Sequence, residues 1–172
     1  MRKTANLKVK AYEHIEHGFE PVYDKRSTIL ILGTMPSVKS RETDFYYGHP
    51  QNRFWKVIAQ VTGEKVPITI REKKALLLRN GIAIWDVIKE CDIVGSDDSS
   101  IKNVVPADIK GILDMTGIKN VYGNGAKACE LYEKFILQDT KIPIIKLPST
   151  SPANAAYSLE KLVDIWREKL GK

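Results

Sequence analysis

Thr28-Ile29-Leu30-Ile31-Leu32-Gly33 is a continuous run of apolar, β-forming residues that ends at a glycine. A run of this kind, with no alternation of polar residues, predicts a strand that is buried on both faces of a sheet. Similar runs recur at residues 82–85, 118–122 and 142–147. Pro143 has no backbone N–H to donate, so the last of these strands is expected at a sheet edge.

Stretches with helical periodicity separate the four runs. Asn52 or a neighbouring residue begins the first helix, and Gly63 ends it. Further helices are expected at residues 68–79, 106–115 and 126–137, and from Pro152 or Ala153 to Leu170. Strands that alternate with helices predict the α/β class, as a three-layer α/β/α fold around a four-stranded, mainly parallel sheet. The length of 172 residues predicts a single domain over residues 1–172.

Composition narrows the class of protein. The net charge of +6 permits a nucleic-acid partner without establishing one. Cys91 and Cys129 are the two cysteines, too few for a disulfide framework, a cysteine zinc motif or an all-cysteine iron–sulfur cluster. Met1-Arg2-Lys3-Thr4 leads into no apolar segment, and no run reaches membrane-spanning length. These features predict a cytoplasmic, nucleoid-associated protein with reduced thiols and no membrane contact.

Three polar turns follow predicted strands, at residues 33–40, 123–125 and 148–154. Ligands of open α/β sheets bind beyond the carboxyl ends of the strands. We therefore expect the three turns to meet in one cleft. Residues 46–55 add four aromatic rings, an imidazole, two amides and an arginine in ten positions, a mixture suited to gripping a flat polar ligand rather than to filling a core.

The segments in and beside these turns carry a family resemblance. They read Gly33-Thr34-Met35-Pro36-Ser37, Tyr46-Tyr47-Gly48-His49-Pro50-Gln51-Asn52 and Leu147-Pro148-Ser149-Thr150-Ser151-Pro152-Ala153-Asn154. In order and spacing they resemble the motifs of the uracil-DNA glycosylase superfamily, and most of all the hypoxanthine-DNA glycosylases. The resemblance implies an enzyme that flips a deaminated base out of DNA and hydrolyses its N-glycosidic bond. We expect a monofunctional glycosylase without lyase activity, because Lys39, in a loop, is the one lysine that stands in the motifs. Hypoxanthine would be the first substrate and uracil the second, with no metal or cofactor and with the protein acting as a monomer.

Hydrolysis requires a water held against the sugar and help for the departing base. Asn52 is the candidate for holding the water, although an asparagine in this position also suits a helix cap. His49 is the second candidate, either for contact with the base or for holding the loop. Asp44 is a rival water activator that equally fits an exposed loop carboxylate.

The base itself needs a pocket. Tyr47 is the candidate stacking platform, while Tyr46 fits loop packing at least as well. Gly33, Thr34, Met35 and Pro36 would line the pocket, and Asn124 would read the base edge unless it is a turn residue at positive φ. Ser149, Thr150, Ser151 and Asn154, expected at the start of the last helix, would grip DNA phosphates, with helix capping as the alternative.

Two positions depart from the family pattern. Met35 stands where many relatives have a carboxylate or amide, and Leu147 stands where many have a histidine. Either residues 46–55 carry most of the catalysis, or the chain is a catalytically weak or inactive nucleic-acid-binding module. A dinucleotide-binding protein is a further alternative, because Gly123-Asn124-Gly125-Ala126-Lys127-Ala128 matches a Gly-x-Gly-x-x-Ala pattern, but the acid expected after the next strand is missing. The spacing of His14 and His17 suits a metal site without a third ligand, so a surface helix is expected there.

Overall fold

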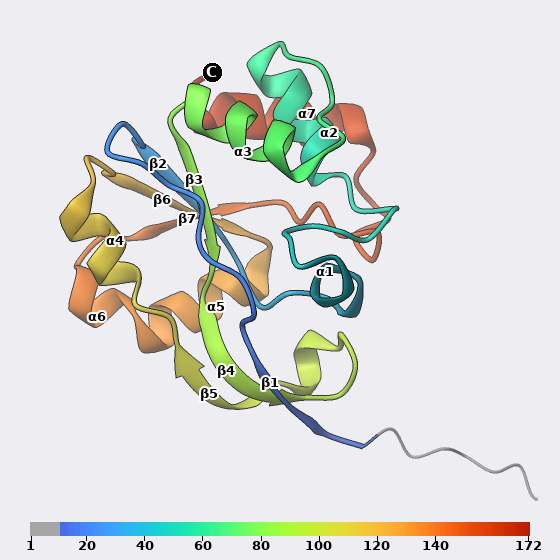
Figure 1. Ribbon diagram of the computed structural model, residues 1–172, viewed down its shortest axis with the longest axis vertical. Coiled ribbons are helices and arrows are strands. Elements are labelled where there is room, and N and C mark those ends of the chain that lie inside the picture. The colour runs from blue at the N-terminus through green and yellow to red at the C-terminus, as the bar shows by residue number, and fades with distance from the viewer. Residues whose placement is uncertain (1–10) are drawn as a thin grey trace, which may run out of the picture.

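The computed structural model describes residues 11–172 (Figure 1). The expectation for the first four residues, that they begin no leader segment, lies outside this range. The central sheet has the strand order β3-β2-β6-β7, and all three pairings are parallel. Its strands are β2 (Ile29–Gly33), β3 (Ile82–Asp86), β6 (Asn120–Asn124) and β7 (Ile144–Leu147). The predicted four-stranded parallel sheet is confirmed, with the proline-led strand at its edge.

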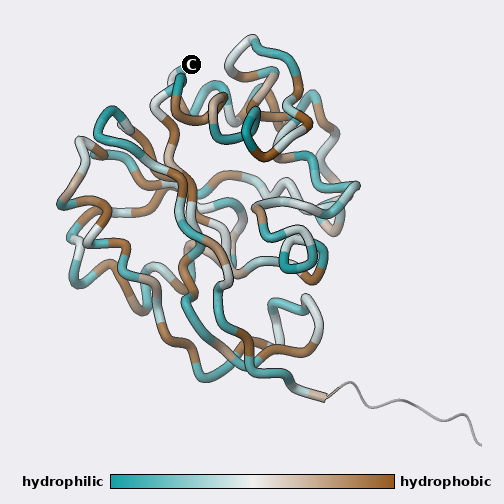
Figure 2. The backbone as a smooth tube through the Cα atoms, viewed as in Figure 1, coloured by the Kyte–Doolittle hydropathy of each residue, from teal (hydrophilic) through white to brown (hydrophobic). Residues whose placement is uncertain are grey.

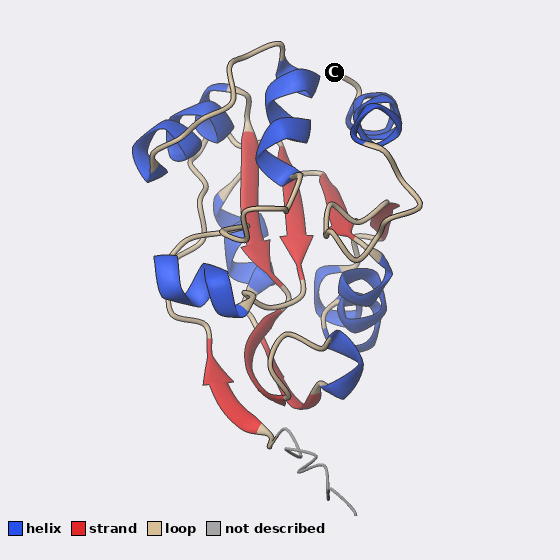
Figure 3. Cartoon of the chain, turned by 90° about the vertical axis from the view of Figure 1, so that its right-hand side faces the viewer, coloured by secondary structure: helices blue, strands red, loops and turns tan. Residues whose placement is uncertain are grey.

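Helices cover both faces of this sheet, as Figure 3 shows from the side. One face packs against α2 (Phe54–Thr62), α3 (Ile70–Arg79) and α7 (Leu159–Leu170), and the other against α4 (Ile109–Met115) and α5 (Ala126–Phe135). The remaining α-helices of the described residues are the short helices α1 (Val38–Thr43) and α6 (Leu137–Thr140).

The alternation of side chains along β2 divides the core between these two faces. Ile31 contributes to the cluster under α2 and α7, while Leu30 and Leu32 contribute to the cluster on the opposite face. All three are fully buried, and the sheet forms the continuous apolar centre of the molecule in Figure 2. The uniform burial explains why the run carries no polar alternation.

A second, antiparallel sheet was not predicted. It consists of β1 (Glu13–Glu16), β4 (Ile88–Ile93) and β5 (Lys102–Pro106), in the order β1-β4-β5. Only Ile88, Cys91 and Ile93 of β4 are buried, and polar residues stand between them in a strand whose pairing with β5 is irregular, so the sequence shows no clear strand period. The expected surface helix around His14 is wrong for the same reason, since β1 is an exposed strand with Ile15 as its one buried residue.

Two helix starts also differ from the prediction. Pro106 ends β5, and α4 begins only after Asp108, whose side chain accepts a hydrogen bond from the Gly111 backbone. The last helix begins at Leu159 with Ser158 as its cap, not at Pro152 or Ala153. Residues 148–158 therefore form an extended loop before the helix. A 3-10 turn, η1 (Asp98–Ser100), lies between β4 and β5.

The loop before α7 is held by Arg53, the residue that precedes α2. Its guanidinium donates to the carbonyl oxygens of Ser151 (2.9 Å) and Asn154 (3.1 Å), and also to that of Tyr157. Its backbone N–H donates to the carbonyl oxygen of Thr150 at 3.1 Å. Because one planar side chain satisfies several carbonyl groups, the loop can keep a fixed shape without regular structure.

Among the described residues, no helix is both long enough and apolar enough to cross a membrane.

Candidate active site

A cavity of about 340 Å³ lies at the carboxyl ends of the central strands. Its walls come from the turn after β2, from the segment before α2, from Asn124 at the end of β6, and from residues 149–153. The predicted meeting of the three polar turns in one cleft is confirmed. The volume lies in the usual range for small-molecule sites.

Asn52 stands at the wall of the cavity with its amide orientation fixed. Its Oδ1 accepts hydrogen bonds from the backbone N–H of Phe54 and from Thr150 Oγ1, both at 2.9 Å. A carbonyl oxygen has two lone pairs, so its capacity to accept is used. The N-cap of α2 is Arg53 and not Asn52, so the expected capping role is not confirmed, and the bond to Phe54 closes the turn just before the helix. Only the Nδ2 amide hydrogens of Asn52 remain for a ligand or a water.

Asn124 is tied to the same threonine. Its Oδ1 accepts from the Thr150 backbone N–H and its Nδ2 donates to Thr150 Oγ1, each at 3.0 Å. Asn124 is not at positive φ, which belongs to the following Gly125. A bidentate contact with a base edge would have to replace both bonds to Thr150, so the amide is better placed to position the loop than to read a base.

Thr150 is fully buried. Its side chain therefore lies inside the protein rather than at a phosphate contact, the role expected for it. It connects Asn124 to Asn52, and so joins the end of β6, the loop before α7 and the start of α2 in one hydrogen-bonded chain. Two of the sequence motifs, residues 46–52 and 147–154, are thereby bonded to each other and to the end of β6 across the cavity wall.

Tyr47 has one face of its ring covered. The ring stacks on Phe54 with centroids 3.9 Å apart and planes at 17°, and the residue has a φ of +54°. A flat ligand could stack only on the opposite face. Burial raises the pKa of the Tyr47 hydroxyl, with a further contribution from the charge of Asp86 and an opposing one from Asn124.

Tyr46 is a core residue. It is buried, its hydroxyl donates to the Glu20 carbonyl oxygen at 2.9 Å, and its own carbonyl oxygen accepts from Trp55 Nε1 at 3.1 Å. The reading of Tyr46 as a packing residue is therefore the better one, although its edge reaches the cavity wall.

His49 lines the cavity and also holds its own loop. Its Nδ1 accepts a hydrogen bond from the Gln51 backbone N–H at 3.1 Å. In the neutral ring the proton is then on Nε2, which can donate to a ligand. Asp44, the rival acid, is exposed at the end of α1 and is not among the residues that line the cavity.

The serine-rich loop is braced internally at the mouth of the cavity. Ser149 Oγ accepts from the Ser151 N–H at 3.1 Å, and Ser151 Oγ accepts from the Ala153 N–H at 3.2 Å. Asn154 Nδ2 donates to the Ser149 carbonyl oxygen at 3.0 Å. The two serine hydroxyls keep their own protons for an anionic acceptor. Because α7 starts at Leu159, the helix N-terminus is not the source of an anion site here.

The turn after β2 is fixed to the β3–β4 junction. Val87 donates its N–H to the Gly33 carbonyl oxygen at 2.9 Å, and Ile88 donates to that of Thr34 at 3.1 Å. Met35 packs against the apolar cluster under α5, and Pro36 follows it along the cavity wall. Leu147 is fully buried at the end of β7. Neither Met35 nor Leu147 supplies a polar group to the site.

Two residues of the site were missed. Asp86 ends β3 and lines the cavity, and its Oδ2 lies 2.7 Å from Nε2 of the buried His17. The prediction stopped the strand at Trp85, one residue short of this acid. An acid directly after a buried strand was the available signal, because strand ends are where ligands bind.

A second acid, Asp98, lies at the exposed rim of the cavity. Loss of water around its carboxyl group raises the pKa of Asp98 to about 6, an effect opposed by Lys127 and supported by the negative charges of Asp97 and Asp86. Asp98 lies in a polar stretch, residues 95–100, that carries none of the three motifs.

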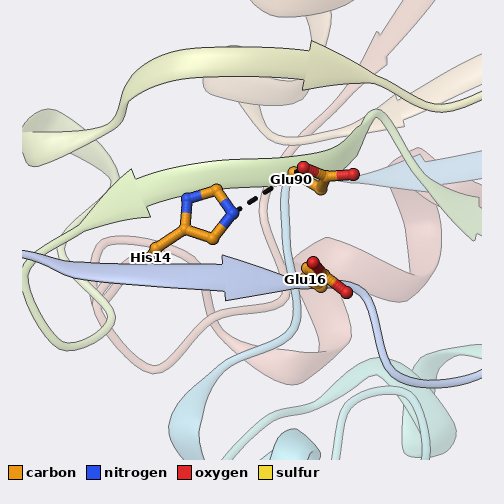
Figure 4. A group of neighbouring side chains, drawn as sticks. All are labelled: His14, Glu16 and Glu90. Carbon is orange, nitrogen blue, oxygen red and sulfur yellow. Dashed lines mark ion pairs between the residues drawn. The ribbon is translucent and has the colours of Figure 1, made fainter.

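His14 and His17, whose spacing suited a metal site, have different partners in the structure. His14 has Glu16 and Glu90 as neighbours on the outer surface of the antiparallel sheet (Figure 4), while His17 faces Asp86. His14 lies 3.7 Å from Glu90, and its other ring nitrogen is 2.9 Å from Asp92. The hydrogen bond to Asp92 raises the pKa of His14. These contacts make an exposed ion-pair group, which needs no metal.

Comparisons with known proteins agree with this arrangement. Residues 20–169 match the family model described as the uracil DNA glycosylase superfamily. A hypoxanthine DNA glycosylase of Methanosarcina acetivorans is 38% identical over 149 residues, which are 84% of this chain and 91% of the relative. A protein of the same name from Methanosarcina barkeri is 36% identical over 158 residues, 89% of this chain and 96% of the relative. The solution NMR structure of a candidate uracil DNA glycosylase from Methanosarcina acetivorans has a TM-score of 0.74 and 34% identity, and covers 88% of this chain and 96% of that one.

Proposed function

Because the chain belongs to the uracil DNA glycosylase superfamily, we propose that it is a monofunctional DNA glycosylase that removes deaminated bases, hypoxanthine first and uracil second. The observation that supports the proposal is the Asn124–Thr150–Asn52 chain of hydrogen bonds, which joins the second and third motifs at one cavity that the first motif, residues 33–37, also lines. Two relatives that share most of this chain are named for hypoxanthine excision.

The base enters the cavity after it leaves the DNA stack, since its glycosidic bond is out of reach inside a duplex. The free face of Tyr47 is the stacking surface, with Phe54 supporting the ring from behind. Stacking on an aromatic ring contributes about 1–3 kcal/mol per base and tolerates different bases. Residues 33–36 form the adjoining wall.

Asn52 then acts through its amide hydrogens. Nδ2 donates to the oxygen of the attacking water and holds it beneath C1′ as the sugar gains positive charge. Asn52 cannot remove a proton from this water, so bond breaking runs ahead of attack. His49 Nε2 faces the cavity as the donor that assists the departing base.

The DNA strand lies across the mouth of the cavity. The hydroxyls of Ser149 and Ser151 donate to phosphate oxygens there, and exposed Lys39, which is paired with Glu42 at 3.0 Å, lies at the rim. The net charge of +6 favours nonspecific association with DNA. The enzyme works as a monomer at the nucleoid.

A panel of duplexes tests the proposal. Oligonucleotides with deoxyinosine, deoxyuridine, deoxyxanthosine or a G·T mismatch are incubated with the protein, and alkali then cleaves any abasic site. The expected result is fastest cleavage at deoxyinosine, followed by deoxyuridine, and no strand break without alkali. Binding to these duplexes without abasic product from any of them would identify an inactive binding module and contradict the proposal.

A further inference from the structure

A histidine and an aspartate form a buried pair beside the cavity, and the aspartate lines it. His17 Nε2 and Asp86 Oδ2 are 2.7 Å apart, and the two side chains are 4% and 6% exposed. Because a carboxylate only accepts, the proton of this bond is on His17. The described residues include a second His–Asp pair, His14 with Asp92, whose side chains are 57% and 25% exposed. Neither residue of the second pair lines the cavity.

The second carboxylate oxygen of Asp86 has no such partner. In residues 11–172, the hydrogen bond given to the Asp86 carboxylate is the one from His17 to Oδ2, and Oδ1 is not among the buried atoms that lack a partner. Oδ1 lies against Gly33, the residue opposite Asp86 in the strand pairing, where any Cβ would collide with it. The Tyr47 hydroxyl approaches the same point and is itself buried without a hydrogen bond. Asp86 thus presents one available acceptor in the lining of the site.

Such an acceptor can serve a ligand. Carboxylates in a folded protein are normally paired or hydrogen-bonded on both oxygens. Oδ2 of Asp86 is paired with His17, and Oδ1 belongs to a side chain that lines the cavity. A hydrogen-bond donor on the ligand would give the second oxygen of Asp86 a partner.

The geometry of base flipping identifies this donor. The glycosidic nitrogen of a flipped purine stays at the mouth, attached to the DNA backbone, so the opposite edge of the ring reaches the floor. In hypoxanthine that edge carries N1–H beside the C6 carbonyl group. In adenine the same nitrogen carries a lone pair.

We propose, on the basis of the glycosylase function above, that Asp86 accepts the N1–H of hypoxanthine and that His17 positions its carboxylate for this contact. The pair selects a base with a protonated ring nitrogen at this edge, and it repels a lone pair in the same place. Discrimination between the deaminated base and its parent is thereby built into the end of β3, outside the three motifs.

Paired substrates test this assignment under single-turnover conditions. One duplex carries deoxyinosine, and the other carries unsubstituted purine deoxyriboside, which lacks both N1–H and the C6 oxygen. The quantity measured is the ratio of the two excision rates, which does not depend on how much of each variant is folded. Asp86→Leu removes the acceptor, Asp86→Asn keeps one, and Asp92→Asn alters the exposed His–Asp pair as the matched control.

The ratio is expected to fall about tenfold or more in Asp86→Leu, to fall less in Asp86→Asn, and to stay unchanged in Asp92→Asn. Wild-type protein should also reject N1-methyl deoxyinosine, a test that requires no variant. An unchanged ratio in Asp86→Leu, or equal excision of the N1-methylated base, would contradict the role of Asp86 alone. Failure of the wild type to excise hypoxanthine would contradict the proposed function and this inference together.

Discussion

Thr150 Oγ1 donates a hydrogen bond to Asn52 Oδ1 at 2.9 Å, although the two residues are 98 positions apart in the sequence. The bond fixes which side of the Asn52 amide faces the cavity. It also makes the loop before α7 a support for the proposed water-holding residue.

Replacing Thr150 with valine preserves the volume but removes this support. We expect the excision rate to fall about tenfold and the free energy of unfolding to fall by about 1–3 kcal/mol, because Asn124 and Asn52 lose a buried partner. Thermal unfolding and single-turnover excision measure the two effects. Thr62→Val is the control, since Thr62 bonds only to carbonyl groups of its own helix, and its excision rate should match the wild type.

Gly33→Ala should disturb the floor of the site. The added Cβ would collide with the Asp86 carboxylate, which His17 prevents from moving freely. We expect a loss of stability of about 1–3 kcal/mol with a strong loss of excision, measured by denaturant unfolding and product formation. Gly117→Ala meets no atom within 4 Å and should leave excision intact; equal behaviour of the two variants would show that the floor is not as tight as described.

Arg53→Lys should fail to replace arginine. A lysine ammonium group cannot reach the several carbonyl oxygens that the guanidinium bonds at once. The variant should unfold at lower temperature and become sensitive to proteolysis within residues 149–158, as peptide mapping would detect. Protease resistance equal to that of the wild type would mean that the loop is held by other contacts.

Stability should depend on pH through Asp98. Its pKa is raised from 3.8 to about 6 in the folded protein, so the folded state binds more protons than the unfolded state between these values. The contribution of Asp98 to the stability of the folded state is therefore fully present below pH 3.8. This contribution is lost as the pH rises through 6. Asp98→Asn should remove this loss, seen as a smaller fall in melting temperature from pH 4 to 7, whereas Asp164→Asn on the exposed face of α7 should keep it.

The central sheet could be predicted because its strands are buried on both faces. Leu30, Ile31 and Leu32 are consecutive, fully buried apolar residues in a short β-forming run, and the glycine after them marks the turn. The antiparallel sheet could not be predicted in this way, since β4 buries only Ile88, Cys91 and Ile93, and its pairing with β5 is irregular. The start of α7 was misplaced because Pro152 follows serine residues, as at many helix starts, while the actual cap is Ser158.

The residues that line the site could largely be predicted from the motifs, but the hydrogen bonds that connect them could not. Motif residues such as Tyr47 and Asn52 do line the cavity. The burial of Thr150 and its links to two asparagines depend on contacts between distant segments, which local patterns do not encode. His17 and Asp86 lie outside the motifs, and only the pairing of β2 with β3 brings Asp86 beside Gly33.

The amide hydrogens of Asn52 are proposed to perform the catalytic task, and the substitution Asn52→Asp is the sharpest test of that role. Aspartate keeps an oxygen for the bonds from Phe54 and Thr150 but replaces the Nδ2 donor with an acceptor, whereas Asn52→Ala removes both. We expect single-turnover excision of hypoxanthine to fall about tenfold or more in both variants, while binding to the deoxyinosine duplex persists. Excision at the wild-type rate by both variants would show that Asn52 does not hold the attacking water.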